Sequence, residues 1–482
     1  MLLKLSKNAF IRQFGRFSYV LDRIRSADQM FADAEVFLRG IKRFPREKSA
    51  ILQEILSAYV DADADEISRD FDEFLAPLLA AKVVLCGETI EELEASEVSF
   101  SYDVDDPKTA ERKRVISQQE KDFLPQTVLG DFFERNPMLY QLQMDITQSC
   151  TERCLHCYIP EYNPIFLPME KLREVIDDFA MMGGLVLTLS GGECMMHPDF
   201  DEIVRYARSK DLIVTILSNL TLCDDAKIRL LKENEVSVQA SLYSMNAEVH
   251  DGITRRPGSW QKTKSAIEAL RAAQIPCTLA CPTMKQNYHD YLGVLNYARS
   301  LKMHAITDCI ILGKMNGDTS NLACRLDLDE TQQILEDITF RAVPMKSEFF
   351  SPGKKAMMQT DEEWMNDKVC GAGFSSICLS ADGNYYPCAA WGGYVLGSCY
   401  QSSLREVWEE SPAILRLRKV RGRDFPKCAH CKDRDYCSVC MCRNFNESGN
   451  MFEPAEHFCK VAEINHCLVD ELQARMEKAN DL

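Results

Sequence analysis

Residues 145–157 read DITQSCTERCLHC and decide the fold, because they join an apolar run to a group of three cysteines. The run Leu139–Ile146 predicts a β-strand, and Cys150, Cys154 and Cys157 follow it in the spacing C-x3-C-x2-C. Three thiolates on one tight loop can bind three corners of a [4Fe–4S] cluster and leave its fourth iron open. A structural zinc site normally has four closed ligands. The spacing therefore favours a redox cluster over zinc.

Strand-like and helical stretches alternate around this motif, between residues 136 and 320. The helical patterns include MEKLREVIDDFA, FDEIVRYARSK and WQKTKSAIEALRAA. Such alternation is typical of parallel strands with helices outside, where the chemistry lies at the carboxyl ends of the strands. We predict an α/β fold, a partial (β/α)6 TIM-like barrel. Its predicted strands are Leu139–Ile146, Leu185–Leu189, Leu212–Leu217, Val236–Ala240, Cys277–Cys281 and Ala305–Leu312.

The second predicted strand ends in Ser190-Gly191-Gly192-Glu193. With the cysteine motif and His156 inside it, this turn makes the stretch Leu139–Leu312 resemble the radical S-adenosylmethionine (SAM) superfamily. The resemblance implies that the glycine backbone and the Glu193 carboxylate bind the SAM amino group, and glycines permit that close backbone approach. Cys194 stands where the superfamily often has proline.

Other strand ends carry polar residues that the same resemblance makes candidate SAM contacts. The alternative interpretation is that they cap strand ends or are exposed loop charges. These candidates are Tyr158, Ser218, Asn219, Ser241 and Arg255.

The resemblance also implies the chemistry. The reduced cluster at the three catalytic cysteines passes an electron to the sulfonium of SAM, and the resulting 5′-deoxyadenosyl radical removes hydrogen from an unactivated C–H bond. The cofactor supplies this reactivity, while the protein positions the reactants and excludes water. An electron donor such as flavodoxin or ferredoxin is an expected partner.

A second cysteine group fills the C-terminal part of the chain, residues 321–482. Cys370-x12-Gly383-x4-Cys388 precedes Cys428-x2-Cys431-x5-Cys437, and further cysteines follow. This spacing resembles the SPASM domain, which implies two auxiliary [4Fe–4S] clusters and three in total. The alternative is a pair of zinc ribbons. Because the region lacks regular alternation, we expect it to depend on metal rather than on a large core.

The resemblance divides these cysteines between two clusters. One set is Cys428, Cys431, Cys437 and Cys459, and the other contains Cys370 and Cys388 with a later cysteine. The SPASM spacing would put that cysteine at position 441, which is Met441, so the choice between Cys440 and Cys442 stays open. The fourth ligand is open among Cys378, Cys324, a non-cysteine ligand and a vacant position.

Residues 1–90 predict a small α+β domain with a hairpin and three helices. A strand-like stretch, Leu2–Phe10, precedes a hairpin around Gly15, and a helix carrying Phe71 and Leu75 precedes a strand at Val83–Leu85. Pro77 should kink that helix. The domain resembles a recognition element of ribosomally made, post-translationally modified peptides (RiPPs), which implies a winged-helix-like α+β fold and leader binding by strand addition. The alternative is a generic helical extension.

A charged stretch, residues 91–135, should form a linker with a short helix near Val128–Arg135. Together the resemblances imply a radical SAM peptide maturase that binds a ribosomal precursor through its leader and installs an intrapeptide crosslink. We favour a thioether, because an open auxiliary iron could bind a substrate thiolate. The alternatives are a carbon–carbon crosslinking or epimerising maturase, a sulfatase-maturase-like protein oxidase, and a non-catalytic zinc-binding adaptor.

Composition narrows the class of protein further. The 482 residues carry a net charge of −17, which argues against a nucleic-acid partner. No window is apolar enough for a membrane span, and the N-terminus lacks a secretory pattern. The 21 cysteines of a long chain without such a signal favour metal ligation in a reducing compartment over disulfides. We therefore expect a cytoplasmic protein.

Overall fold

The computed structural model describes residues 1–480 except 15–16, 24–26, 60–62, 98–135 and 341–359. The chain divides into two compact units: Met1–Arg135 with Gly183–Leu185, and Asn136–Met182 with Val186–Leu482. The predicted helix at 128–135 lies outside the described residues. The predicted division of the second unit near residue 320 stays a prediction.

The first unit contains two small antiparallel sheets. β1 (Leu2–Leu5) pairs with β5 (Arg46–Glu47) and β6 (Val84–Gly87). β2 (Ala9–Phe14), β3 (Phe17–Asp22) and β4 (Ala27–Ala32) form the second sheet, with Phe14 opposite Phe17. The strand pairing expected of a hairpin is therefore present. The single strand predicted over Leu2–Phe10 is wrong, because the chain turns at residues 6–8 and enters a different sheet.

In the described part of this unit, four helices accompany the sheets: α1 (Glu35–Arg39), α2 (Lys48–Ser57), α3 (Ala64–Ala80) and α4 (Ile90–Ser96). The apolar face of α3 is buried with Leu3, Val84 and Ile51 in one core. Pro77 lies inside α3, and the helix continues past it to Ala80. Pro77 is exposed and removes one backbone hydrogen bond near the end of the helix, and the kink expected there stays a prediction.

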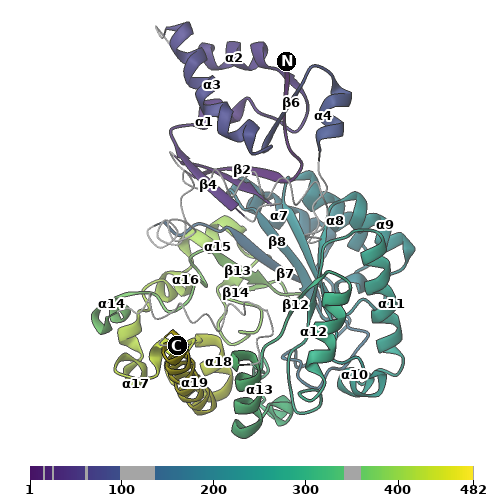
Figure 1. Cartoon of the computed structure of the whole chain (residues 1–482), viewed down its shortest axis with the longest axis vertical. Helices are drawn as coiled ribbons and strands as arrows, with labels where there is room; N and C mark the ends of the chain where they lie inside the picture. The colour runs from purple at the N-terminus through teal and green to yellow at the C-terminus, as the bar shows by residue number, and fades with distance from the viewer. Residues whose placement is uncertain (15–16, 24–26, 60–62, 98–135, 341–359, 481–482) are drawn as a thin grey trace. The chain divides into compact units, whose positions relative to one another are not determined.

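The second unit is built on the predicted parallel sheet, which is confirmed. Helices α8 (Phe200–Ser209), α9 (Asp225–Glu233), α11 (Ser259–Ala272) and α12 (Tyr291–Ser300) follow one another along the outside of the strands (Figure 1). α7 (Met169–Met181) and α10 (Ala247–Thr254) belong to the same βα series. The strands are β7 (Gln141–Thr147), β8 (Val186–Gly191), β9 (Ile213–Ser218), β10 (Ser237–Ser241), β11 (Cys277–Ala280) and β12 (His304–Ile306).

The C-terminal region extends this sheet. β13 (Ser376–Leu379) pairs in parallel with β7, and β14 (Asn384–Tyr386) and β15 (Gly397–Ser398) continue from it. Ile377, Leu379 and Trp408 are buried in the same apolar core as the barrel strands. The expectation that this region lacks a sizeable core is therefore wrong. β12 ends at Ile306, well short of the predicted Leu312.

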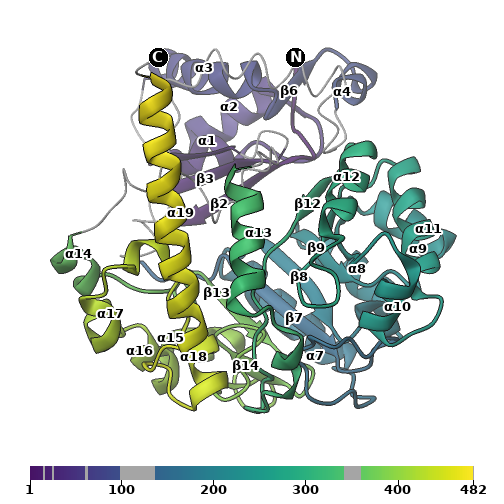
Figure 2. The same cartoon turned by 60° about the horizontal axis from the view of Figure 1, so that its bottom comes forward.

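Helices surround the remaining C-terminal segments. The long pair α13 (Leu328–Phe340) and α19 (Glu456–Asn480) lies side by side (Figure 2). Shorter α-helices are α14 (Asp361–Asn366), α15 (Leu404–Glu410), α16 (Pro412–Leu417), α17 (Pro426–Ala429) and α18 (Met441–Ser448). The 3-10 turns of this unit are η2 (Cys194–Met196), η3 (Ser320–Cys324), η5 (Gly422–Asp424) and η6 (Arg434–Tyr436).

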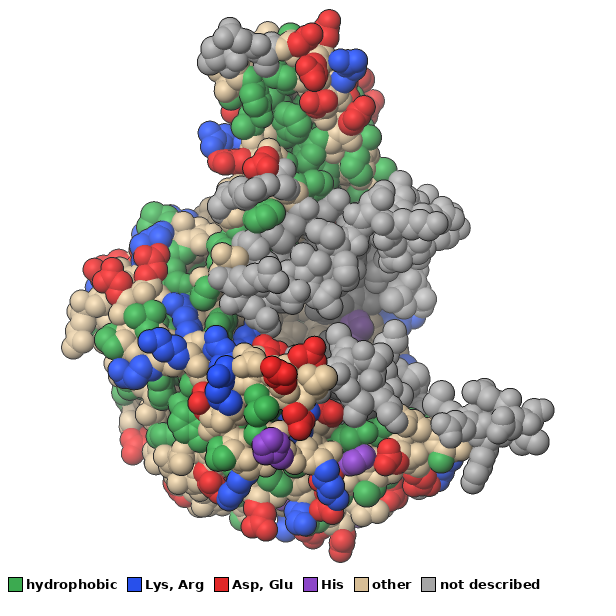
Figure 3. Space-filling view, turned by 90° about the vertical axis from the view of Figure 1, so that its left-hand side faces the viewer, with side chains coloured by type: hydrophobic (Ala, Val, Ile, Leu, Met, Phe, Trp, Pro, Cys, Tyr) green, Lys and Arg blue, Asp and Glu red, His purple; other side chains and the backbone are tan. Residues whose placement is uncertain are grey.

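Two surface observations concern the described residues. None of their helices combines the length and apolar character needed to cross a membrane. On the face in Figure 3, acidic and basic side chains are interspersed around hydrophobic ones.

Candidate metal and cofactor site

The predicted cysteine loop begins directly after β7, at the carboxyl end of the parallel sheet. Burial raises the pKa of Cys150 to about 12 and that of Cys154 well above its usual value, and the charge of Cys157 raises both further. The three thiols are therefore neighbours. Two backbone hydrogen bonds tie the loop to the end of α10, from the Arg153 N–H to an oxygen at residue 254 and from residue 155 to residue 253, each 2.9 Å.

The Gly-Gly turn after β8 lies against the backbone of the cysteine loop. The Gly192 N–H donates to the Thr147 carbonyl oxygen at 2.8 Å, and the Glu193 N–H donates to that of Ser149 at 2.8 Å. A Cβ at Gly191 would lie 2.2 Å from the Thr147 oxygen, and one at Gly192 would lie 2.3 Å from the Ser149 oxygen. Gly191 also has φ +127°. Only glycine permits this close approach.

The Glu193 carboxylate is buried at the centre of this arrangement, with 1% of the residue exposed. Oε1 accepts hydrogen bonds from Ser218 Oγ at 2.8 Å and from the Met195 N–H at 3.1 Å, and Oε2 accepts one from the Asn219 N–H at 2.8 Å. Burial raises the pKa of Glu193, and these hydrogen bonds oppose the rise. A carboxylate has about four lone-pair positions, so Oε2 retains capacity for an ammonium group.

Two further strand ends reach the cysteine loop. Asn219 Nδ2 lies 3.7 Å from Cys150 Sγ and donates to Thr151 Oγ1 at 3.0 Å. Ser241 ends β10, two residues before Tyr243, whose hydroxyl lies 3.9 Å from Cys154 Sγ. The structure thus brings the predicted Ser218, Asn219 and Ser241 to one end of the sheet, around Glu193 and the three thiols.

Arg255 and Tyr158 are placed differently. Arg255 is exposed at the C-terminal cap of α10. Burial raises the pKa of Glu152 in the cysteine loop to about 8, and the charge of the neighbouring Arg256 only partly opposes that rise. Tyr158 packs against the apolar cluster that contains Cys442, Cys440 and Cys388. The structure therefore brings Tyr158 to the C-terminal cysteines and leaves the Arg255 side chain in solvent.

Cys388, Cys440 and Cys442 belong to one apolar cluster of the C-terminal region, together with the buried Trp391. The thiols of Cys388 and Cys440 raise the pKa of Cys442. Burial raises the pKa of Cys370, with a further contribution from the charges of Cys388 and Cys440. The sequence left Cys440 and Cys442 as alternatives, and the choice between them stays open.

The other predicted set, Cys428, Cys431, Cys437 and Cys459, stays a prediction, and its thiols affect one another's pKa. Burial raises the pKa of Cys428 to about 11, and the charges of Cys437, Cys459 and Cys431 raise it further. Cys437 is likewise affected by the charges of Cys459 and Cys431. Among the described residues, no three Cys, His, Asp or Glu side chains converge on the position of a single metal ion.

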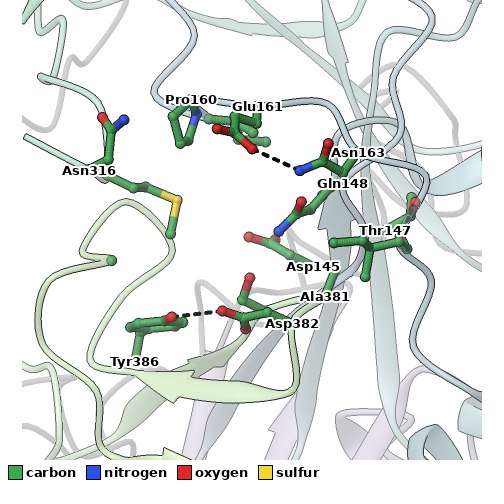
Figure 4. Close-up of a pocket in the computed structure, with 16 residues that line it drawn as sticks. Asp145, Thr147, Gln148, Pro160, Glu161, Asn163, Asn316, Ala381, Asp382 and Tyr386 are labelled. Carbon is green, nitrogen blue, oxygen red and sulfur yellow. Dashed lines mark hydrogen bonds between the residues drawn. The ribbon is translucent and has the colours of Figure 1, made fainter. Parts of the chain in front are cut away.

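A cavity of about 330 Å³ opens beside the Gly-Gly turn (Figure 4). Gly191 and Thr147 line it together with Asp382, whose Oδ2 accepts a hydrogen bond from the Tyr386 hydroxyl at 2.9 Å. Asp145 and Asp382 point toward its interior in Figure 4, and burial raises the pKa of Asp145 to about 6. Sequence reasoning missed these residues, although a carboxylate in the apolar run before Cys150 was a visible signal.

The residues fit the groups that the motifs imply. Clustered thiols are the ligands of iron–sulfur clusters. The Gly-Gly turn leaves no room for side chains, and Glu193 can accept a hydrogen bond from an amine. The cysteine loop with Glu193, Ser218 and Asn219 could therefore hold a cluster and a small cationic cofactor side by side.

Comparisons with known proteins agree with this geometry. Residues 144–313 match the radical SAM superfamily, and residues 370–432 match SPASM, an iron–sulfur cluster-binding domain. The two domains imply SAM and multiple [4Fe–4S] clusters as cofactors.

The related proteins of known function have different activities. The AdoMet-dependent heme synthase of Methanosarcina barkeri is 25% identical, and the match covers 65% of this chain and 94% of that protein. The antilisterial bacteriocin subtilosin biosynthesis protein AlbA of Bacillus subtilis is 26% identical, over 65% of this chain and 69% of that protein.

Among solved structures, Streptococcus suis SuiB bound to the precursor peptide SuiA superposes with a TM-score of 0.62 at 13% identity. The superposition covers 95% of this chain and 99% of that one. It shows a shared fold.

Proposed function

Because the chain carries a radical SAM domain and a SPASM domain, we propose that it is a peptide maturase. It abstracts hydrogen from a ribosomal precursor peptide and installs an intrapeptide crosslink. The observation that carries this proposal is the cavity that Gly191, in the SAM-type turn, shares with Asp145 and with Asp382 of the SPASM region. A residue of a peptide placed there would lie between the two domains' cysteine groups.

In this proposal Cys150, Cys154 and Cys157 hold the reactive cluster, and a bound SAM molecule supplies the radical that breaks a C–H bond. Glu193 accepts a hydrogen bond from the SAM amine, while Ser218 and the Asn219 N–H fix the carboxylate. An electron donor such as flavodoxin or ferredoxin would reduce the cluster.

The cavity chemistry supports a polar peptide substrate. Asp145 can hold or release a proton near neutrality because burial raises its pKa to about 6. The Asp382 carboxylate is fixed by Tyr386 and by the Asn384 N–H, at 2.9 Å each, so it keeps one orientation toward the cavity. Both carboxylates can accept hydrogen bonds from the substrate backbone or side chains.

The first unit would bind the leader. β2 and β4 are the outer strands of a three-stranded antiparallel sheet, and an extended peptide can add to such an edge. The fold shared with SuiB extends over 95% of this chain, and the precursor peptide in that structure supports the same substrate class here. The likeness of this unit to a RiPP recognition element is part of the proposal.

A direct test is to delete residues 1–97 and measure binding of the precursor encoded nearest to this gene. Affinity should fall at least tenfold, while iron content and SAM cleavage without peptide stay unchanged. Undiminished affinity in the truncated protein would contradict leader binding at this unit.

The type of bond that the enzyme forms in the peptide can also be tested. A crosslinked product lacks two hydrogen atoms, and a thioether additionally consumes a thiol that alkylating reagents detect. An epimerised product has an unchanged mass and takes up deuterium from heavy water or from a labelled donor. An unmodified peptide in the presence of active SAM cleavage would contradict the proposed substrate.

Heme chemistry is the second candidate, because a heme synthase is among the relatives. That relative is matched over 94% of its length but only 65% of this chain, so a heme synthase lacks a counterpart to about a third of this protein. Incubation with an iron porphyrin precursor should leave its absorption spectrum unchanged. Conversion to heme would replace the maturase proposal.

A further inference from the structure

Arg443 is a buried cation in the first turn of α18, and 5% of the residue is exposed. Its Nη2 donates a hydrogen bond to the Ser438 carbonyl oxygen at 2.7 Å, and its guanidinium carbon lies 3.6 Å from the centre of the Phe458 ring. Its Nε is buried and has no hydrogen-bond partner among the described residues. The guanidinium group of arginine keeps its charge in proteins, so this buried positive charge needs a compensating anion.

The carboxylate that follows Arg443 along the helix is already engaged. Glu447 lies one helical turn later, and its two oxygens accept hydrogen bonds from Arg325 at 2.6 and 3.1 Å. Arg325 also lies over the Phe458 ring, 4.8 Å from its centre. Within the described part of the chain, Arg443 forms no ion pair. Two buried arginines therefore contact one aromatic ring, and only Arg325 has a carboxylate to balance its charge.

The contacts of Arg443 place its charge next to C-terminal cysteines. Ser438, which accepts its hydrogen bond, directly follows Cys437, and Phe458 directly precedes Cys459. Both cysteines belong to one predicted ligand set. The guanidinium group is therefore held between the two chain segments that carry these cysteines.

An iron–sulfur cluster in this region would supply the missing anion. Four thiolates make a [4Fe–4S] cluster a net anion, and reduction adds one more negative charge. A cation beside the cluster stabilises the reduced form more than the oxidised form, because the attraction grows with the charge of the cluster. The net charge and the polar surroundings of a cluster set its reduction potential.

We propose that Arg443 is the counter-charge of an auxiliary cluster held by the set Cys428, Cys431, Cys437 and Cys459, and that it raises the reduction potential of that cluster. Arg443 acts through its charge and is not a ligand. This inference rests on the match to the SPASM domain and goes beyond the proposed function, because it needs no peptide substrate. A cluster with a higher potential is the better electron acceptor.

The test uses the full chain, reconstituted anaerobically, with Cys150, Cys154 and Cys157 replaced by alanine so that only auxiliary clusters give electron paramagnetic resonance signals. Arg443→Gln removes the charge and keeps an amide that can donate to Ser438. In a redox titration, the reduction equilibrium of one auxiliary cluster should shift at least tenfold toward the oxidised form, which is about 59 mV for a one-electron couple. Arg443→Lys keeps the charge and should retain most of the original potential.

Arg416→Gln is the matched control. Arg416 is exposed on α16, where solvent and salt screen its charge, so its loss should leave the potentials of the auxiliary clusters unchanged. Iron counts distinguish a shifted potential from a lost cluster. Loss of iron in Arg443→Gln with iron retained in Arg443→Lys would also support a role of the charge.

Two results would overturn the proposal. One is full iron and an unchanged potential in Arg443→Gln. The other is an equal effect of Arg443→Gln and Arg443→Lys on potential or iron content, which would show that the shape of the side chain matters and its charge does not. Neither readout involves the peptide, so a failure of peptide modification contradicts the proposed function alone.

Discussion

At the scale of the residue, Gly192 sets how closely the Gly-Gly turn approaches the cysteine loop. Replacing it with alanine puts a Cβ 2.3 Å from the Ser149 carbonyl oxygen, well inside contact distance, so the turn must move by about 1 Å. A misplacement of that size can reduce a rate about 100-fold. We expect Gly192→Ala to lower SAM cleavage by about that factor with the iron content unchanged.

Gly252→Ala provides the control for that substitution. Gly252 lies in α10, it is exposed, and a Cβ there meets nothing within 4 Å. Alanine should stabilise the helix by about 0.5–1 kcal/mol and leave SAM cleavage as it is. Equal activity in both variants would show that the close approach at Gly192 has no role in positioning the cofactor.

The sequence alone reveals some residues of the site and not others. The cysteines and the Gly-Gly-Glu turn can be recognised by their spacing. Asp145 gives a local signal as a carboxylate in an apolar run, but nothing in the sequence indicates that it shares a cavity with Asp382 and Tyr386. Residues from distant segments give no local signal of their contact.

At the scale of the element, α10 and α11 are joined by one carboxylate. Asp251 in α10 accepts hydrogen bonds from the Gly258 N–H at 2.6 Å, Ser259 Oγ at 2.9 Å and the Trp260 N–H at 2.8 Å. Gly258, the N-cap of α11, has no side chain to do this. Asp251 therefore caps α11 from the neighbouring helix, whose C-terminal end also holds the cysteine loop.

This cap predicts a pH-dependent stability difference. Partial burial favours a higher pKa for Asp251, but hydrogen bonds from Trp260 and Gly258 outweigh it and hold the pKa below its usual value. The carboxylate thus contributes stability above about pH 4, and that contribution is lost as pH falls through the folded-state pKa. Asp251→Asn should cost about 0.5–2 kcal/mol at pH 7 and progressively less in acid.

Denaturant unfolding at pH 7 and pH 3.5 measures this difference. Glu248→Gln is the matched control, since it removes the same charge from an exposed position of the same helix. It should stay within about 0.5 kcal/mol of the original protein. A constant cost for Asp251→Asn across both pH values would argue that packing, and not the ionised cap, is what matters.

Helices and strands could be predicted from the sequence where the pattern of apolar residues was regular. The βα alternation located each barrel strand, because buried parallel strands are apolar runs between amphipathic helices. Pro77 is compatible with α3 because the helix loses only one backbone hydrogen bond there, on its exposed face near its end. The strand over Leu2–Phe10 was misjudged because propensity does not reveal which sheet a segment joins.

At the scale of the whole molecule, a buried ion pair joins two segments of the second unit that are far apart in the sequence. Arg325, which follows η3, makes a two-point ion pair with Glu447 of α18, at 2.6 and 3.1 Å. Their side chains are 8% and 13% exposed. Arg325 also donates to the Ile311 carbonyl oxygen at 2.5 Å.

Breaking this buried pair should be costly. Arg325→Met leaves Glu447 buried without its partner, which destabilises by about 3–5 kcal/mol. We expect a lower melting temperature and loss of auxiliary-cluster iron, because α18 carries Cys442. The double variant Arg325→Met with Glu447→Met should recover much of the loss, since no charge is left unpaired. A double variant as unstable as the single one would contradict this account.

The sequence by itself determined the barrel class, the place of the cysteine loop after the first barrel strand and the Gly-Gly-Glu turn after the second. All of these are local patterns, in which residue types at fixed spacing dictate a strand or a tight turn. Only the tertiary structure joined β13 to β7, placed Cys388, Cys440 and Cys442 in one apolar cluster, and formed the cavity. These depend on long-range packing, because the burial of apolar surface, and not local propensity, selects which distant segments meet.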